Sequence, residues 1–151
     1  MQAPLYDKKQ SGFTLIEVLL SVGIIALLSV TLTPVFQSFQ VRNDLDIATV
    51  SIVQSLRRAQ VLSQSVDGDT TWGVNIQSAS TTVFKGASFV TRDITYDELF
   101  DVPLSITPSG LSSTTFAKLS GLPNATGTIT LTSNINETRT ITINDKGTIL
   151  Y

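Results

Sequence analysis

The residue types with the clearest chemical potential lie near the start of the chain, where Lys8 and Lys9 come shortly before Gly12 and a long apolar run. Glu17 is the only charged residue between Gly12 and Val41. An unpaired carboxylate at the centre of a bilayer costs on the order of 2–3 kcal/mol or more. Such a carboxylate is therefore unlike an accident of composition and indicates a functional residue, because a buried carboxylate needs a partner.

The apolar run, residues 13–35, is long enough to cross a bilayer, for which about 20 apolar residues suffice. Lys8 and Lys9 on its N-terminal side favour a cytoplasmic N-terminus and a single outward crossing. A secretory signal peptide would have an apolar core of about 7–15 residues and a small-residue cleavage site. This run is longer and ends in Thr-Pro-Val-Phe. A plain membrane anchor explains everything here except Glu17 and the junction between Gly12 and Phe13.

The stretch that starts at Gly12, Gly-Phe-Thr-Leu-Ile-Glu-Val-Leu-Leu, resembles the N-terminal signature of type IV prepilins and type II secretion pseudopilins. The resemblance implies that a membrane-embedded prepilin peptidase cuts between Gly12 and Phe13 on the cytoplasmic side. It also implies that the new amine of Phe13 becomes N-methylated and that Glu17 pairs with this amine on a neighbouring subunit. The alternatives for Glu17 are the amine of its own chain and a place near the lipid headgroups.

Beyond the apolar run, the spacing predicts that one helix continues from Phe13 to Val66. Its apolar residues recur at intervals of three and four, as in the buried stripe of an amphipathic helix: Val41, Leu45, Ala48, Ile52, Ser55 or Leu56, Ala59 and Leu62. Gly68 can adopt the left-handed conformation that ends helices. Pro34 removes a backbone hydrogen bond and predicts a kink. A helix boundary at the membrane surface is the alternative reading of Pro34.

The remainder of the chain has the alternation and turn residues of antiparallel strands. We expect strands at residues 72–76, 82–84, 127–132, 138–143 and 148–151. The middle of the chain, roughly residues 86–123, should hold two or three short strands, of which 104–107 is one. The predicted fold class is α+β and pilin-like, with one long N-terminal helix packed on an antiparallel β-sheet. The predicted segments are a cleaved cytoplasmic leader, a transmembrane half of the helix, an amphipathic half and a β-rich extracytoplasmic domain: residues 1–12, 13–35, 36–66 and 67–151.

Two further stretches are similar to the GspH/FimT group of minor pilins and pseudopilins. They are L-R-R-A-Q-V-L-S-Q, residues 56–64, and the closing T-I-T-I-N-D-K-G-T-I-L, residues 140–150. The resemblance implies a minor subunit of a type IV pilus or a type II secretion pseudopilus in the bacterial inner membrane. Its partners would be prepilin peptidase, other pilin subunits and the inner-membrane assembly platform. A major pilin, or a DNA-binding minor pilin of a DNA-uptake pilus, is the alternative.

Composition argues against catalysis. The 151 residues include no His, the commonest general base and metal ligand, and no Cys, so no disulfide can form. A serine or threonine nucleophile would need an activating partner, and no S-x-x-K spacing or nucleophile elbow is present. The sequence therefore predicts a protein that is not an enzyme and has no cofactor.

One acidic cluster could hold calcium, which takes carboxylate oxygens as ligands. Its members are Asp93, Asp97, Glu98 and Asp101. They do not form the Asp-x-Asp-x-Asp-Gly pattern of a calcium loop, and their spacing of three or four fits a short solvated helix. The sequence therefore predicts no metal site here.

Three arginines on the amphipathic helix, Arg42, Arg57 and Arg58, could contact DNA phosphates. A DNA footprint needs several clustered basic side chains, and the chain has a net charge of −2. Neighbouring arginines on a helix also point about 100° apart. Nucleic acid is therefore not the expected partner.

Overall fold

The computed structural model describes residues 12–151, without the side chains of residues 30–37. The chain divides into two compact units at Gln37, and each is described by itself. The predicted leader, residues 1–12, lies outside the described residues except for Gly12. Both the helix and the strands expected from the sequence are present, so the α+β class is confirmed.

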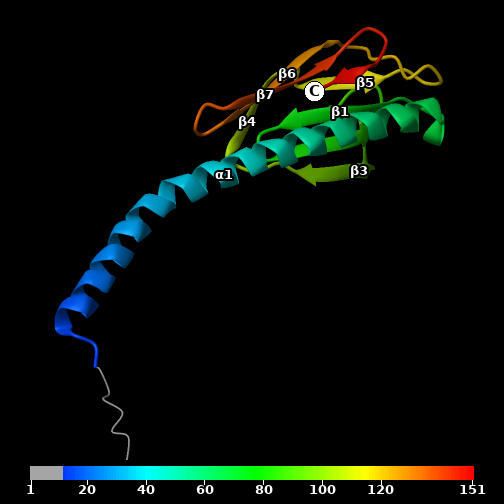
Figure 1. Cartoon of the computed structure of the whole chain (residues 1–151). Coiled ribbons are helices and arrows are strands. Elements are labelled where there is room, and N and C mark those ends of the chain that lie inside the picture. The colour runs from blue at the N-terminus through cyan, green and yellow to red at the C-terminus, as the bar shows by residue number, and fades with distance from the viewer. Residues whose placement is uncertain (1–11) are drawn as a thin grey trace, which may run out of the picture. The chain divides into compact units, whose positions relative to one another are not determined.

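One long α-helix, α1, runs without a break from Leu15 to Gln64 and is coloured blue to green in Figure 1; a short 3-10 helix, η1, follows at Asp67–Asp69. Its ends lie within two residues of the predicted Phe13 and Val66. Pro34 lies inside α1, but its side chain is outside the described part of the chain, so the kink stays a prediction. Among the described residues, no helix is both long enough and apolar enough to cross a membrane. The predicted membrane segment, 13–35, extends into the residues whose side chains are not described.

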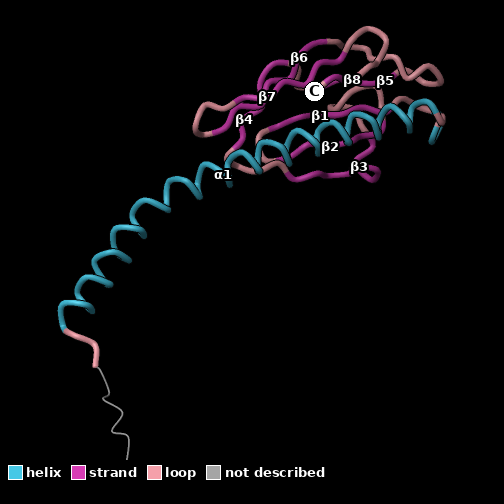
Figure 2. The backbone as a smooth tube through the Cα atoms, viewed as in Figure 1, coloured by secondary structure: helices cyan, strands magenta, loops and turns pink. Residues whose placement is uncertain are grey.

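The strands of the second unit form two antiparallel sheets, which Figure 2 shows in magenta beside the second half of α1. The β1 sheet has the order β3-β2-β1-β5, and the β6 sheet has the order β4-β6-β7-β8. The strand bounds are β1 (Trp72–Gln77), β2 (Ser80–Lys85), β3 (Asp93–Asp101), β4 (Ile106–Gly110), β5 (Ser113–Phe116), β6 (Gly127–Ser133), β7 (Thr138–Ile143) and β8 (Ile149–Leu150).

The core of the second unit lies between α1 and the inner faces of both sheets. From α1, the predicted stripe is buried from Val41 to Ala59, with Leu62 half-buried. The alternating strands contribute their inward residues, among them Val74, Val83, Ile129 and Ile141. The period of 3.6 in the helix and of two in the strands therefore places the apolar side chains as the sequence predicts.

Buried polar residues on α1 are satisfied by the backbone. The hydroxyl of Thr49 donates to the carbonyl of Leu45 at 2.7 Å. Ser63 Oγ accepts a hydrogen bond from the amide of Trp72 at 2.9 Å and so joins the end of α1 to the start of β1. Because buried polar groups without partners are costly, these bonds let α1 pack closely against the sheets.

The prediction of a short helix over residues 93–101 is wrong, because these residues form β3. Residues 98–101 pair with residues 80–83 of β2 in an antiparallel ladder. The spacing of the carboxylates is compatible with a helix, but Tyr96, Glu98 and Phe100 also alternate with the period of a strand. The ladder with β2 decides between the two periods, since tertiary context overrides weak local preference.

Two other features differ from the sequence expectation, namely the position of one strand and the number of sheets. The strand expected at 104–107 lies at Ile106–Gly110, and β5, Ser113–Phe116, lies in the region 86–123 where the sequence predicts short strands without giving all their bounds. The strands also divide into two sheets. Both β4 and β5 lie in the stretch rich in proline, serine and threonine, where no alternation of apolar residues marks a strand. They are held by pairing with β6 and β1, which local sequence does not reveal.

We expect a fragment of residues 38–151 to fold as a soluble α+β monomer, since its core lies entirely within it. In this fragment, Ile52→Ala should lower the free energy of unfolding by about 2–5 kcal/mol, because Ile52 is 0% exposed. The matched change Ile47→Ala on the same helix should cost about 0.5 kcal/mol or less, because Ile47 is 51% exposed. Urea unfolding followed by circular dichroism measures both. Equal losses in the two variants would contradict this core.

Candidate processing and assembly site

Thr14 begins helix α1. Its carbonyl accepts hydrogen bonds from the amides of Glu17 and Val18 at 3.1 and 3.2 Å. Its hydroxyl oxygen also accepts from the Glu17 amide at 3.4 Å. A threonine that accepts a bond from the amide three residues later is the N-cap of a helix and satisfies one of its free N–H groups. Residues 12–14 are therefore non-helical, and the helix starts directly after them.

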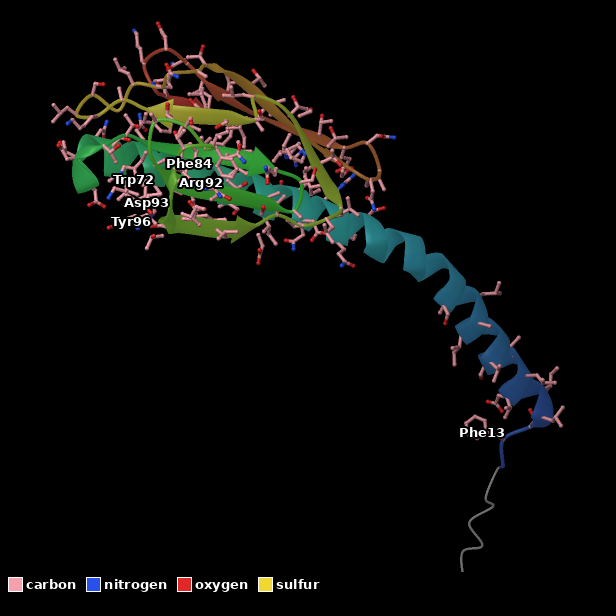
Figure 3. All side chains as sticks on the ribbon, turned by 180° about the vertical axis from the view of Figure 1, so that it is seen from behind. Phe13, Trp72, Phe84, Arg92, Asp93 and Tyr96 are labelled. Atoms are coloured by element: carbon pink, nitrogen blue, oxygen red, sulfur yellow. The ribbon has the colours of Figure 1, made fainter. Side chains whose placement is uncertain are left out.

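The Gly12–Phe13 junction lies in this non-helical segment and is open to solvent. Phe13 is 81% exposed, and Figure 3 labels it just before the helix. A Cβ atom added at Gly12 would meet no heavy atom within 4 Å. Exposed chain outside regular structure is where proteases act most readily. The structure therefore presents the junction in a form that a peptidase can reach.

Glu17 lies in the first turn of α1, three residues after the N-cap. Its side chain is exposed and makes no ion pair with any described residue. A carboxylate in the first turn interacts favourably with the partial positive charge of a helix N-terminus. Thr14 and Glu17 also have the spacing of a capping box. This spacing is the signal in the sequence that marks Thr14, whereas the pattern of charged and apolar residues does not mark it.

The helix after Glu17 presents apolar side chains in every direction. The large apolar residues from here to Leu28 are at least half exposed or nearly so: Val18, Leu19, Leu20, Val22, Ile24, Ile25, Leu27 and Leu28. Successive residues on a helix are about 100° apart, so these positions surround the axis. A helix that is apolar all round is stable only when something else covers it, such as lipid or other helices.

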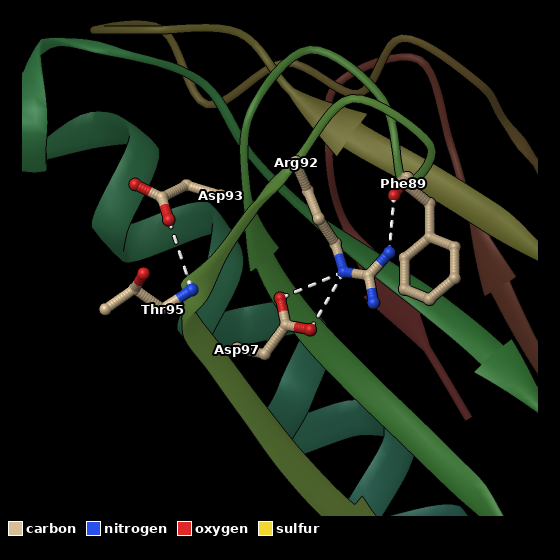
Figure 4. Close-up of polar contacts among 5 residues, drawn as sticks. All are labelled: Phe89, Arg92, Asp93, Thr95 and Asp97. Atoms are coloured by element: carbon tan, nitrogen blue, oxygen red, sulfur yellow. Dashed lines mark hydrogen bonds and ion pairs between the residues drawn. The ribbon is translucent and has the colours of Figure 1, made fainter.

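The acidic cluster does not converge. Asp97 pairs with Arg92, whose Nε lies 2.8 Å from Oδ2, and an oxygen of Asp93 accepts from the amide of Thr95 at 3.1 Å, as Figure 4 shows. Glu98 pairs with Arg58 of α1. In the part of the chain that the structure describes, no group of three or more His, Cys, Asp or Glu residues could hold a metal ion.

The arginines of α1 bind groups within the protein. Arg42 pairs with Glu137 and Arg58 with Glu98, at 2.9 and 2.7 Å, and the guanidinium of Arg57 lies over the ring of Tyr151. The hydrogen bond from Arg58 lowers the pKa of Glu98 below its ordinary value of 4.5. These contacts join α1 to β3 of one sheet and to the β6–β7 turn and the residue after β8 of the other.

The lowered pKa of Glu98 predicts a pH dependence of stability. Because the pKa of the folded state lies below that of the unfolded state, the stabilisation is complete above about pH 4.5. It should disappear as the pH falls through the folded-state pKa. We expect Glu98→Gln in the 38–151 fragment to cost about 0.2–1 kcal/mol at pH 7 and progressively less below pH 4.5.

Urea unfolding of four fragments between pH 3 and 7 measures this effect: wild type, Glu98→Gln, Arg58→Gln and the double variant. With Arg58 replaced, the further change at Glu98 should no longer give a pH-dependent loss, because the interaction is already gone. A pH-dependent loss of the same size in both backgrounds would show that Glu98 acts through another group.

Comparison with known families gives a match that covers the region of this site. Residues 7–33 match the family model described as the prokaryotic N-terminal methylation motif, and this range includes Gly12, Phe13, Thr14 and Glu17. The match supports a type IV pilin-like protein, in a class of structural subunits that a peptidase processes and that assemble with other pilin subunits. The helix on antiparallel strands is itself a pilin-like α+β arrangement. No curated protein and no solved structure matches the chain.

Proposed function

We propose that this protein is a minor pilin or pseudopilin, a structural subunit of a type IV pilus or a type II secretion pseudopilus. The observation that carries the proposal is the match of residues 7–33 to the N-terminal methylation motif. The finer assignment to the GspH/FimT group rests on residues 56–64 and 140–150 and on the strands that follow α1.

In this proposal a prepilin peptidase removes residues 1–12, and the amine of Phe13 is then N-methylated. Support comes from the open, non-helical Gly12–Phe13 junction. Residues 13–35 anchor the subunit in the inner membrane, with the N-terminus on the cytoplasmic side. The apolar side chains that surround α1 from Val18 to Leu27 support this role, because they are about half exposed or more. Pro34 is the place where α1 bends as subunits pack.

The mechanism is mechanical. The subunit waits in the membrane, and the assembly platform moves its apolar helix from lipid into the core of the fibre. There the carboxylate of Glu17 meets the amine of Phe13 on a neighbouring subunit. Charges attract far more strongly in such a water-free core than in solution. Because leaving either charge unpaired costs several kcal/mol, the pair selects the correct register of each incoming subunit.

The cleavage step predicts that Gly12→Val leaves the leader uncut. A Cβ atom added at Gly12 meets no heavy atom of its own chain within 4 Å. We therefore expect the loss of cutting to arise in the peptidase site, where the larger side chain intrudes. Mass spectrometry of the expressed protein should show a methylated Phe13 as the first residue in wild type and the full leader in the variant. Gly23→Val is the matched control and should be cut normally. A Cβ atom added at Gly23 also meets no heavy atom within 4 Å. An intact leader in wild type would rule out the proposed processing.

The pairing of Glu17 predicts that Glu17→Ala is inserted and cut normally but is at least tenfold depleted in sheared fibres, because the neighbouring amine is left without a partner. Ser21→Ala is the matched control: Ser21 lies one turn later on α1, and its hydroxyl donates only to the carbonyl of Glu17. It removes a polar group without removing a charge and should enter fibres normally. Immunoblots of sheared fibres and membranes measure both variants. Normal incorporation of Glu17→Ala would leave Glu17 without a role in assembly.

A further inference from the structure

We propose that Thr14 is a positioning residue for the cleavage reaction: by capping α1, it holds the Gly12–Phe13 bond outside the helix, where a peptidase can act on it. The inference rests on the proposed function, and adds to it the device that places the cut. It follows from the contacts of the Thr14 side chain and carbonyl with the first turn of α1.

The position of the helix start matters because a peptide bond inside a helix is a poor substrate. Its carbonyl and N–H are engaged in the helical ladder, and side chains wrap the backbone on all sides. Helix α1 begins at Leu15, directly after Thr14, so residues 12–14 and the scissile bond between Gly12 and Phe13 lie outside the helix. The exposed Phe13 and the open space at Gly12 show that nothing else in the described chain shields this bond.

Without the Thr14 hydroxyl, the Glu17 amide keeps the Thr14 carbonyl as its acceptor but loses the side-chain bond at 3.4 Å, so a start at Thr14 is less favoured over an earlier one. The first four N–H groups of a helix lack partners inside it, and an apolar environment makes their loss of hydrogen bonds costly. The nearest side chain upstream that can cap a helix is that of Ser11, three residues before Thr14. A helix capped by Ser11 would take Gly12 and Phe13 into its first turn, where the Gly12 carbonyl accepts a helical hydrogen bond and the neighbouring turn crowds the scissile bond. The peptidase would then reach this bond less readily.

The alternative is that the peptidase reads the shape of Thr14 directly, and three substitutions separate the two explanations. Valine has the shape of threonine but no hydroxyl, whereas asparagine has a different shape but is a good N-cap. Serine preserves both properties in part. If Thr14 acts as a cap, the serine and asparagine variants should be cut faster than the valine variant. If the peptidase recognises the shape of Thr14, the valine variant should be cut faster than the asparagine variant.

The experiment uses the full chain in detergent micelles with a purified prepilin peptidase and measures the initial rate of cleavage by mass spectrometry. Wild type, Thr14→Ser and Thr14→Asn should be cut at rates within about twofold of each other. Thr14→Val should be cut about five- to tenfold more slowly, as the strength of a typical N-cap implies. Amide hydrogen exchange of the uncut chains should show the amide of Leu15 protected only in Thr14→Val, because the helix then starts earlier.

The outcomes distinguish this inference from the proposed function. If wild type is cut after Gly12 and Thr14→Val is cut as fast, or Thr14→Asn is slowed as much as Thr14→Val, the capping role is overturned while the function stands. Slow cleavage of Thr14→Val without protection of the Leu15 amide would also overturn it. A wild-type chain that is never cut after Gly12 would overturn the proposed function, and this inference with it.

Discussion

The constraint on which the rest of the structure depends is that one continuous helix, α1, carries two different surfaces. Up to Leu28 its large apolar side chains are exposed in all directions. From Val41 onward only one stripe is apolar, and the strands cover it. The apolar side chains of the first surface are exposed among the described residues, whereas the strands cover the second surface. The second unit can therefore be a complete domain, while the first part of α1 remains available for other partners.

The second surface is fixed by contacts on both sides of the buried stripe. Arg42 and Arg58 pair with Glu137 and Glu98, which belong to different sheets or their turns. Near the end of the helix, the side-chain amide nitrogen Nε2 of Gln60 donates to the backbone carbonyls of Gly121 and Gly147, each at 3.1 Å. Each exposed pair contributes little alone. Together with the core they hold the second half of α1 against both sheets, and they pair Arg42 and Arg58 within the protein.

The sequence predicts those parts of the fold that depend on local periodicity. The stripe on α1, the β1–β2 hairpin and the β6–β7–β8 meander all have a clear period, and all are present. It does not give the bounds of β5 and misassigns β3, because both are decided by pairing with other strands, β1 for β5 and β2 for β3. At the candidate site, Gly12, Phe13 and Glu17 stand out by residue type, whereas Thr14 stands out only through its spacing from Glu17. A capping role depends on where the helix starts, and that becomes visible in the hydrogen bonds.

An apolar environment places two requirements on the first turn of α1, one on its backbone amides and one on its charged side chain. A helix entering lipid or a fibre core must satisfy its backbone amides, and a charged group there must find a partner. Thr14 satisfies the amide of Glu17 with its own carbonyl and hydroxyl. The carboxylate of Glu17 is the only charge of residues 12–40 and makes no ion pair with any described residue. Because only that charge lacks a partner, pairing it with an amine would make the apolar helix specific for its neighbour, whereas its apolar surface alone fits any covering.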